Sequence, residues 1–268
     1  MAITSMVKTR ALRAIAGKVD TRGACGCAPP AAGLGAGVGA GVGAGHGDMP
    51  RDGGLTRYGA GGACCDTFVI FNPNPWPRSE VVTVPLWDRD WQPDQLIIRD
   101  DAGHTCPAQF LERGGFWGHS CLNVALPVHQ VPAFGYRTVS VMRAPEPGVV
   151  EAACTGDGRG TIENEFLRVT VEQESGAIIH LIDKATGLEL VPAGEKLGAL
   201  EYVLEAPHAM SAWIYGQPIT TLLFREGATL ECPHNGPYLA VVRAKHTYND
   251  STFTLTIALA AGVPRVDF

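Results

Sequence analysis

The sequence predicts an all-β protein. From residue 66 onward, short runs of apolar and β-branched residues follow one another. Gly, Pro or Asn bounds each run, at a spacing of roughly 8–12 residues that is typical of sandwiches and barrels. Charged residues make up only 18% of the 268-residue chain, which contains 33 glycines and 19 prolines. This composition favours short strands and turns over long helices. We therefore expect a two-part β-sandwich, preceded by a short N-terminal helix and a flexible linker.

One helix is expected, at residues 1–22. Its apolar residues fall at helical spacing and its basic residues form a polar face: Leu12, Ile15 and Val19, and Lys8, Arg10, Arg13 and Lys18. An arginine-rich, acid-poor amphipathic N-terminus is typical of an organelle transit peptide. The same pattern fits the last helix of an upstream domain, and the family resemblance described below favours this second interpretation.

The next segment, residues 23–65, is rich in Gly and Ala and is expected to be a flexible linker. Such a sequence buries too little apolar surface to offset its backbone entropy. Its glycines do not indicate a phosphate-binding loop, because no strand precedes them and no Lys-Ser/Thr pair follows.

Two β units are expected after the linker, a small sandwich at 66–148 and a larger one at 149–268, with residues 145–160 connecting them. The strands predicted in the first unit are Thr67–Phe71, Glu80–Val84, Leu96–Arg99 and Tyr136–Met142. Those predicted late in the second unit are Leu200–Leu204, Leu222–Arg225, Tyr238–His246 and Thr252–Leu259. Asn249-Asp250-Ser251 is expected to be the turn between the last two strands.

A β-hairpin around the polar turn Glu172–Gly176 is the most distinctive feature of the second unit. Alternate residues are expected to share a face in each of its strands: Leu167, Val169 and Val171 in the first, and Ile178, His180 and Ile182 in the second. A further turn, Asp183–Gly187, is expected to lead into another strand at Leu188–Val191.

Charge and hydropathy narrow the classes of partner. The formal net charge is −6 and the isoelectric point is near 5.7, which argues against nucleic acid or an anionic membrane as a partner. No apolar run approaches the ~18 residues of a membrane span.

The eight cysteines lack the C-x₂-C spacing of zinc sites. No secretory h-region precedes them, which favours a reducing compartment such as the cytoplasm.

Six runs of residues carry a resemblance to a known family. They are Val69–Pro73 with Trp76–Arg78, Val131–Thr138, Glu163–Leu190, Met210–Trp213, Gly236–Tyr238 and Gly262–Phe268. In this order they resemble the C-terminal β-domain of glycoside hydrolase family 38, the α-mannosidases, over most of residues 66–268. The resemblance implies a galactose-mutarotase-like supersandwich in the second unit. It also implies that residues 1–22 are the remnant of the helical bundle that precedes this domain.

The resembled enzymes are zinc-dependent retaining hydrolases of terminal α-mannosides that form a covalent glycosyl-aspartate. Their zinc ligands and nucleophile lie on an N-terminal α/β barrel and in the bundle region, which we do not expect in this chain. The nearest match to their His-x-Asp-x-Gly-Trp metal motif is His46-Gly47-Asp48, but Met49-Pro50 follow it and it lies in the predicted linker. The expectation is therefore no catalytic residue, no metal ligand and no cofactor here, with zinc belonging to the resembled full-length enzymes.

Glu163 and Glu165 are the most tempting pair of catalytic carboxylates. Residues two apart on a strand share a face, with Cα atoms about 6–7 Å apart. This overlaps the carboxyl separation of about 5–5.5 Å in a retaining glycosidase, but such carboxylates normally flank a cleft instead of sitting on one strand. Both are expected to be structural, with Asn164 satisfying backbone groups at the turn.

Two segments that place aromatic residues beside glycine offer rings on which a sugar could stack. Trp213 and Tyr215 are the candidate substrate-binding residues, and Trp117 is a weaker candidate. The competing interpretation is core packing, because Trp and Tyr are largely buried on average.

Three interpretations of function remain open. The first is the C-terminal part of an α-mannosidase-like hydrolase without its catalytic domain, whose partners are an α-mannoside or another carbohydrate and an upstream catalytic domain. The second is a stand-alone carbohydrate-binding β-sandwich module. The third is a degraded gene product, because the chain stops inside an apparent strand at Val266–Phe268, which would truncate the larger sandwich.

Overall fold

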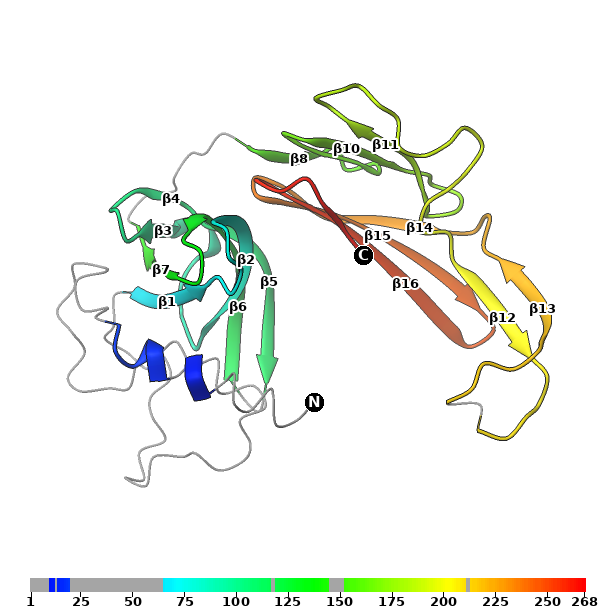
Figure 1. Ribbon diagram of the computed structural model, residues 1–268, viewed down its shortest axis with the longest axis horizontal. Helices are drawn as coiled ribbons and strands as arrows, with labels where there is room; N and C mark the ends of the chain where they lie inside the picture. The colour runs from blue at the N-terminus through cyan, green and yellow to red at the C-terminus, as the bar shows by residue number, and fades with distance from the viewer. Residues whose placement is uncertain (1–9, 13, 20–64, 117–118, 145–151, 211–212) are drawn as a thin grey trace. The chain divides into compact units, whose positions relative to one another are not determined.

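A computed structural model describes residues 10–12, 14–19, 65–116, 119–144, 152–210 and 213–268. Residues 10–12 and 14–16 are helical, and strands dominate the remainder, so the all-β prediction is confirmed (Figure 1). The chain divides into two compact units, 1–151 and 152–268. Of the linker predicted at 23–65, residues 23–64 lie outside the described residues, as does His46-Gly47-Asp48, whereas Cys65 begins a strand. No helix among the described residues is long and apolar enough to cross a membrane.

The first unit is a sandwich of two antiparallel sheets. Its strands are β1 (Cys65–Phe71), β2 (Arg78–Trp87), β3 (Leu96–Asp100), β4 (Thr105–Pro107), β5 (Gln109–Phe116), β6 (His119–Val131) and β7 (Tyr136–Arg143). A short 3₁₀ turn, η2 (Pro93–Gln95), precedes β3. One sheet has the order β1-β7-β3-β4 and the other the order β2-β6-β5. Side chains from both sheets form a single hydrophobic core, as in other face-to-face sandwiches.

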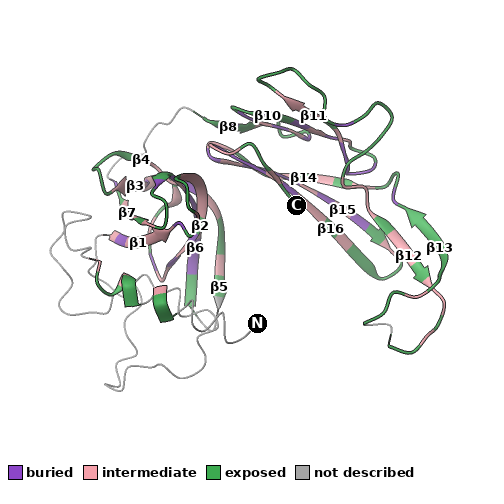
Figure 2. Cartoon of the chain, viewed as in Figure 1, coloured by how far each residue is buried: buried purple, intermediate pink, exposed green. Residues whose placement is uncertain are grey.

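The long central strand β6 supplies much of this core, yet the sequence patterns do not predict it. Leu122, Val124 and Leu126 are buried on it, and so is Ala125 between them, so the alternation of a half-exposed strand is lost (Figure 2). Pro127 would ordinarily argue against a central strand, because it lacks an N–H to donate. It is accommodated because β5 starts opposite Ala125, which leaves Pro127 beside β2 alone.

Two buried polar groups fix the connections of the first unit. The Asn72 amide ends β1: its Nδ2 donates to the carbonyl of Trp76 at 2.7 Å and to that of Val131 at 3.1 Å. The Asp66 carboxylate receives hydrogen bonds from both Nε and an Nη of Arg89, whose guanidinium also lies 4.6 Å from the ring centroid of Trp91.

The second unit contains three antiparallel sheets. Their strands are β8 (Cys154–Gly156), β9 (Thr161–Asn164), β10 (Leu167–Val171), β11 (Ile178–Asp183), β12 (Glu201–Glu205), β13 (Pro218–Leu223), β14 (Thr229–Asn235), β15 (Leu239–Tyr248), β16 (Ser251–Ala260) and β17 (Val266–Asp267). The sheet orders are β11-β10-β9-β8, β12-β13 and β14-β15-β16-β17. The first sheet lies over the third (Figure 1), and the buried Cys154 thiol on β8 donates to the Leu259 carbonyl on β16 at 3.1 Å. These two sheets form the sandwich of this unit.

The hairpin of β10 and β11 is present, but a β-bulge corrects the predicted face of β11. Thr170 pairs with His180 and Val171 pairs with Ile178, so Ile179 is the extra residue. One inserted residue reverses the alternation beyond it. Ile178 is therefore buried with the β10 face, whereas His180 is exposed; they do not share a face as predicted.

Other differences concern the ends and connections of strands. Residues 154–156, predicted to connect the two units, form β8 and pair with β9. The strand predicted at Leu188–Val191 is reduced to a single bridge between Glu189 and Ile182. Strands β4, β5, β6, β8 and β14 were not predicted, whereas β17 lies within the apparent strand expected at Val266–Phe268.

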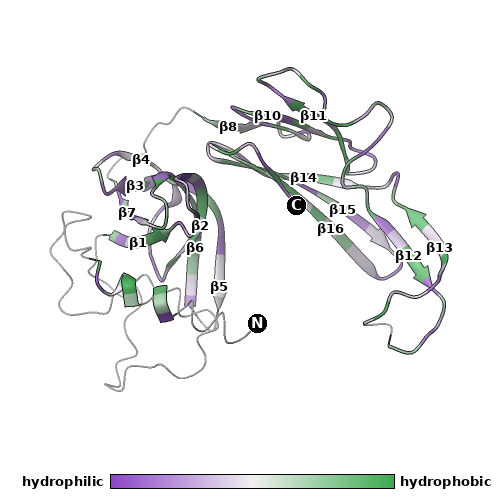
Figure 3. Cartoon of the chain, in the orientation of Figure 1, coloured by the Kyte–Doolittle hydropathy of each residue, from purple (hydrophilic) through white to green (hydrophobic). Residues whose placement is uncertain are grey.

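One hairpin of the second unit is unusually exposed. All six residues of β13 are exposed, and the strand contains Ile219, Leu222 and Leu223 (Figures 2 and 3). Within the described residues, β13 has a paired neighbour, β12, on one side only. The connection between these two strands carries the candidate site.

Candidate functional site

The predicted aromatic residues lie on the connection between β12 and β13. We call residues 206–210 and 213–217 the aromatic loop. Trp213 is 85% exposed and Tyr215 is 68% exposed. Core packing, the competing interpretation, is therefore wrong for both side chains, while sugar contact stays a prediction. Trp117 lies outside the described residues.

Backbone hydrogen bonds hold the aromatic loop in a defined shape. At its base, the Ala206 amide donates to the Gln217 carbonyl at 2.9 Å. Near its tip, the amides of Trp213 and Ile214 both donate to the Met210 carbonyl, at 2.8 and 3.1 Å. These bonds tie Met210 to Trp213 and Ile214, two consecutive residues with large exposed side chains.

The Glu205 carboxylate contacts both arms of the loop, His208 on the rising arm and Gly216 on the returning arm. His208 Nε2 lies 2.9 Å from Glu205 Oε2, and the Gly216 amide donates to the same oxygen at 2.8 Å. His208 Nδ1 lies 2.9 Å from the carbonyl oxygen of Ala209. Both ring nitrogens therefore face acceptors, and only the imidazolium form can donate to both.

The protonation of this pair follows from its contacts. The hydrogen bond to Glu205, followed by that to the Ala209 carbonyl, raises the pKa of His208 above its usual value. The hydrogen bonds from His208 and from the Gly216 amide lower the pKa of Glu205. Each partner thus favours the charged form of the other.

The carboxylates of the Glu163 motif have structural partners. Glu163 Oε2 lies 2.6 Å from Arg168 Nε, and its Oε1 lies 2.6 Å from Lys184 Nζ. Glu165 Oε1 accepts a hydrogen bond from the Gly262 amide at 2.7 Å. The hydrogen bonds from Arg168 and Lys184 lower the pKa of Glu163. A carboxylate held between two cations is poorly suited to donate a proton to a leaving group.

Asn164 satisfies backbone groups at the turn, as predicted. Its Oδ1 accepts from the amides of Phe166 and Leu167 at 2.9 and 2.8 Å. Its Nδ2 donates to the carbonyls of Ala260 and Val263 at 2.7 and 2.9 Å. The second pair of bonds, which ties this turn to the end of β16, could not be read from sequence spacing.

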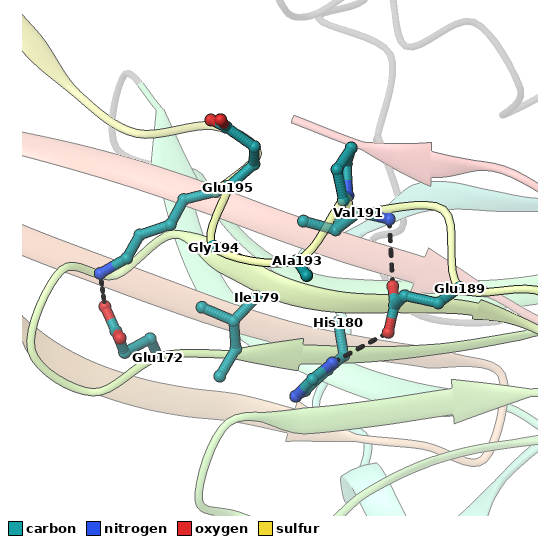
Figure 4. A pocket seen from close by; sticks show the side chains of 10 residues that line it. Glu172, Ile179, His180, Glu189, Val191, Ala193, Gly194 and Glu195 are labelled. Atoms are coloured by element: carbon teal, nitrogen blue, oxygen red, sulfur yellow. Dashed lines mark hydrogen bonds and ion pairs between the residues drawn. The ribbon is translucent and has the colours of Figure 1, made fainter.

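A pocket of about 350 Å³ lies beside β11, and sequence reasoning did not find it. Its lining includes the bulged residue Ile179, which lies between two ion pairs (Figure 4). The Glu172 carboxylate pairs with Lys196, and Glu189 Oε2 lies 2.9 Å from His180 Nδ1.

Two carboxylates of this pocket, those of Glu172 and Glu189, are already engaged in ion pairs. Glu189 Oε1 also accepts from the amides of Leu181 and Val191, at 2.9 and 3.0 Å. A ligand would have to displace these contacts before it could use the carboxylates. We therefore rank the pocket below the aromatic loop as a candidate site.

Comparisons with known proteins agree with this architecture. Residues 162–268 match the family model of the glycosyl hydrolases family 38 C-terminal domain. A crystal structure of a protein in the glycosyl hydrolase family 38 from Enterococcus faecalis is similar, with a TM-score of 0.53, 17% sequence identity, and coverage of 75% of this chain and 30% of that chain. No curated protein matches.

The two matches differ in what they support. At 17% identity, the structural likeness shows the fold alone, and this chain spans only 30% of the length of that neighbour. The family-model match supports the family 38 resemblance for residues 162–268. Neither match names a sugar.

Proposed function

We propose that this chain is the C-terminal β part of a family 38-type glycoside hydrolase that removes terminal α-mannosyl residues with retention. The match of residues 162–268 to the C-terminal domain of that family carries the proposal. Its partners are then an α-mannoside, or another carbohydrate, and a catalytic domain outside this chain. The engagement of Glu163 and Glu165 in structural contacts supports placing the catalytic carboxylates elsewhere.

The contribution of this chain, in the proposal, is a sugar-stacking platform. A pyranose presents an apolar C–H patch on one ring face, and an exposed aromatic ring can cover it. Trp213 and Tyr215 are two residues apart on a loop whose turn and base are hydrogen-bonded. Aromatic side chains have only two side-chain torsions, so they lose little conformational entropy on binding.

The resembled enzymes use zinc, and the described residues do not fit that ion. They contain no group of three or more His, Cys, Asp or Glu side chains that could hold a metal. Glu205 and His208 hydrogen-bond to each other on the aromatic loop, so neither is free to act as a ligand. No step of the proposed function is therefore assigned to a metal held by this part of the chain.

A binding experiment tests the platform. We expect methyl α-mannoside and an α-mannobiose to bind weakly, with Kd values on the order of millimolar, as measured by calorimetry or saturation-transfer NMR. Trp213→Ala should abolish the binding. Trp76→Ala is the matched control, because Trp76 is 57% exposed and lies on the first unit. Equal binding by the wild type and Trp213→Ala would remove the platform from the proposal.

An activity assay tests the placement of the catalytic groups. The purified chain, supplied with zinc and an aryl α-mannoside, should give no turnover. Robust turnover would show that the catalytic groups lie within this chain and would overturn that placement.

A stand-alone carbohydrate-binding module is the second candidate function, and the exposure of Trp213 and Tyr215 favours it equally. The neighbouring coding sequence separates the two candidates. An upstream reading frame with His-x-Asp-x-Gly-Trp supports the divided hydrolase, whereas an unrelated neighbour supports the module.

A further inference from the structure

The turn between β15 and β16 contains the only Asn-x-Ser/Thr sequence of the chain, Asn249-Asp250-Ser251. We call these three residues the sequon. A sequence of this kind is an acceptor for N-linked oligosaccharides when its middle residue is not proline. Neither candidate function uses it. Its suitability as an acceptor depends on where the fold places the asparagine amide and the serine hydroxyl.

The fold presents the sequon to solvent. Tyr248 at the end of β15 pairs with Ser251 at the start of β16, so Asn249 and Asp250 form a two-residue connection at the tip of a long hairpin (Figure 1). Asn249 has a φ of 51°, in the left-handed region that asparagine tolerates. All three residues of the sequon are exposed. An oligosaccharide attached here would extend into solvent without displacing a packed side chain.

The reacting amide is available. Within the part of the chain that the structure describes, neither the Asn249 side chain nor the Ser251 hydroxyl has a hydrogen-bond partner. Asn72 and Asn164, by contrast, are buried, and their amide nitrogens donate to backbone carbonyls. Glycosylation of either would break those bonds. The asparagine of the sequon is therefore one whose amide can be modified without a cost to the fold.

A cysteine gives independent evidence on the compartment. Cys65, the first residue of β1, is disulfide-bonded. Disulfides form and persist in oxidising environments such as the ER lumen and are rare in the cytosol. N-linked glycosylation likewise belongs to secreted proteins. The bond at Cys65 therefore counts against the reducing compartment expected from the sequence and is consistent with the modification.

We propose that Asn249 is the acceptor of an N-linked oligosaccharide, with Ser251 as the hydroxyl residue that marks it for transfer. The co-substrate is an oligosaccharide carried on a lipid diphosphate. Asn249 Nδ2 attacks the anomeric carbon of the first sugar, so that an N–C bond forms while the C–O bond to the diphosphate breaks. The amide nitrogen loses one proton, and the lipid diphosphate leaves with the electron pair of the broken bond. The inference does not depend on the proposed function, because it holds whether or not the chain binds a mannoside.

Peptide mapping tests the acceptor. The chain is purified from its native cells and treated with peptide N-glycosidase in heavy-oxygen water, which converts a glycosylated asparagine into a labelled aspartate. The peptide that contains Asn249 should carry the label. The mass of the treated chain should fall to nearly that of the same chain made in a bacterial cytosol. An unmodified Asn249 in the native protein would overturn the proposal.

Three variants, expressed in the same cells, test recognition of the sequon. Ser251→Ala should abolish the modification, while Ser251→Thr keeps a hydroxyl at this position and should retain it. Thr252→Ala is the matched control, because it removes the neighbouring exposed hydroxyl, which lies outside the sequon, and it should leave the modification unchanged. Modification of Ser251→Ala, or its loss from Ser251→Thr or Thr252→Ala, would overturn the role assigned to Ser251.

Discussion

Replacement of Asn164 by Asp is expected to destabilise the second unit strongly. Asn164 is 2% exposed and makes four hydrogen bonds, two donated by its amide nitrogen and two accepted by its oxygen. Aspartate has nearly the same shape and retains both acceptor contacts. It cannot donate, so the carbonyls of Ala260 and Val263 would face a carboxylate oxygen.

The magnitude follows from these two contacts. Each buried carbonyl left without its donor costs about 1–3 kcal/mol, and burial of a charge against it adds to the cost. We expect a total of about 3–5 kcal/mol, which is a large share of the stability of about 5–15 kcal/mol that a domain of this size has. A loss of about 3 kcal/mol corresponds to a roughly 150-fold larger unfolded population.

Two measurements check this expectation. Urea unfolding gives the change in the free energy of unfolding, and peptide-resolved hydrogen exchange assigns it to a unit. Peptides from β15 and β16 should lose protection, while those from β2 and β6 should not. Asn249→Asp is the control, because it makes the same chemical change at an exposed turn residue whose φ of 51° Asp tolerates. A destabilisation below about 1 kcal/mol for Asn164→Asp would refute the reasoning.

Three further predictions use other groups. Glu163→Gln should make the unfolding free energy of the second unit depend less on pH in the acid range. The pKa of Glu163 is lowered, so the stabilising contribution of its carboxylate is present above about pH 4.5 and is lost as the pH falls through the folded-state value. Urea titrations between pH 2.5 and 7 would show the difference. Asp66→Asn should lower the unfolding free energy of the first unit by about 3–5 kcal/mol because it removes the charge of the carboxylate that the buried Arg89 guanidinium contacts, whereas a paired Asp66→Leu and Arg89→Met exchange should cost much less. Burial raises the pKa of Cys154 to about 11, so iodoacetamide at pH 8 should modify this thiol far more slowly than that of the half-buried Cys232; equal rates would contradict the buried position.

The strands that sequence patterns predict best are those with a clear alternation. β10, with Leu167, Val169 and Val171 buried, follows its pattern throughout. β11 does not, because the bulge at Ile179 depends on how the strand fits its neighbour and not on local preference. β6 is missed for a related reason: burial on both faces removes the alternation, and Pro127 reads as a strand breaker.

The candidate site was predictable in its residue types but not in its geometry. The aromatic character of Trp213 and Tyr215 indicated a sugar platform, but exposure of a loop residue has no periodic signal in sequence. The contact of Glu205 with His208 and Gly216 depends on how the loop returns to its base. Gly216 is needed there because a Cβ atom would lie 2.5 Å from the His208 ring. Sequence alone does not reveal this reason, because a glycine in a loop is ordinarily attributed to turn formation.

The exposed strand β13 bears on how the protein behaves in concentrated solution. It runs from Pro218 to Leu223 without a charged residue, and within the described residues its outer edge has no neighbour. Natural proteins usually protect such edges with lysine, proline or a bulge, because an open row of amides and carbonyls can pair with another molecule. Here Pro218 protects only the first position, so the strand is open to intermolecular β-pairing and aggregation. Thr221→Lys would place a charge in the middle of the strand and so oppose that pairing.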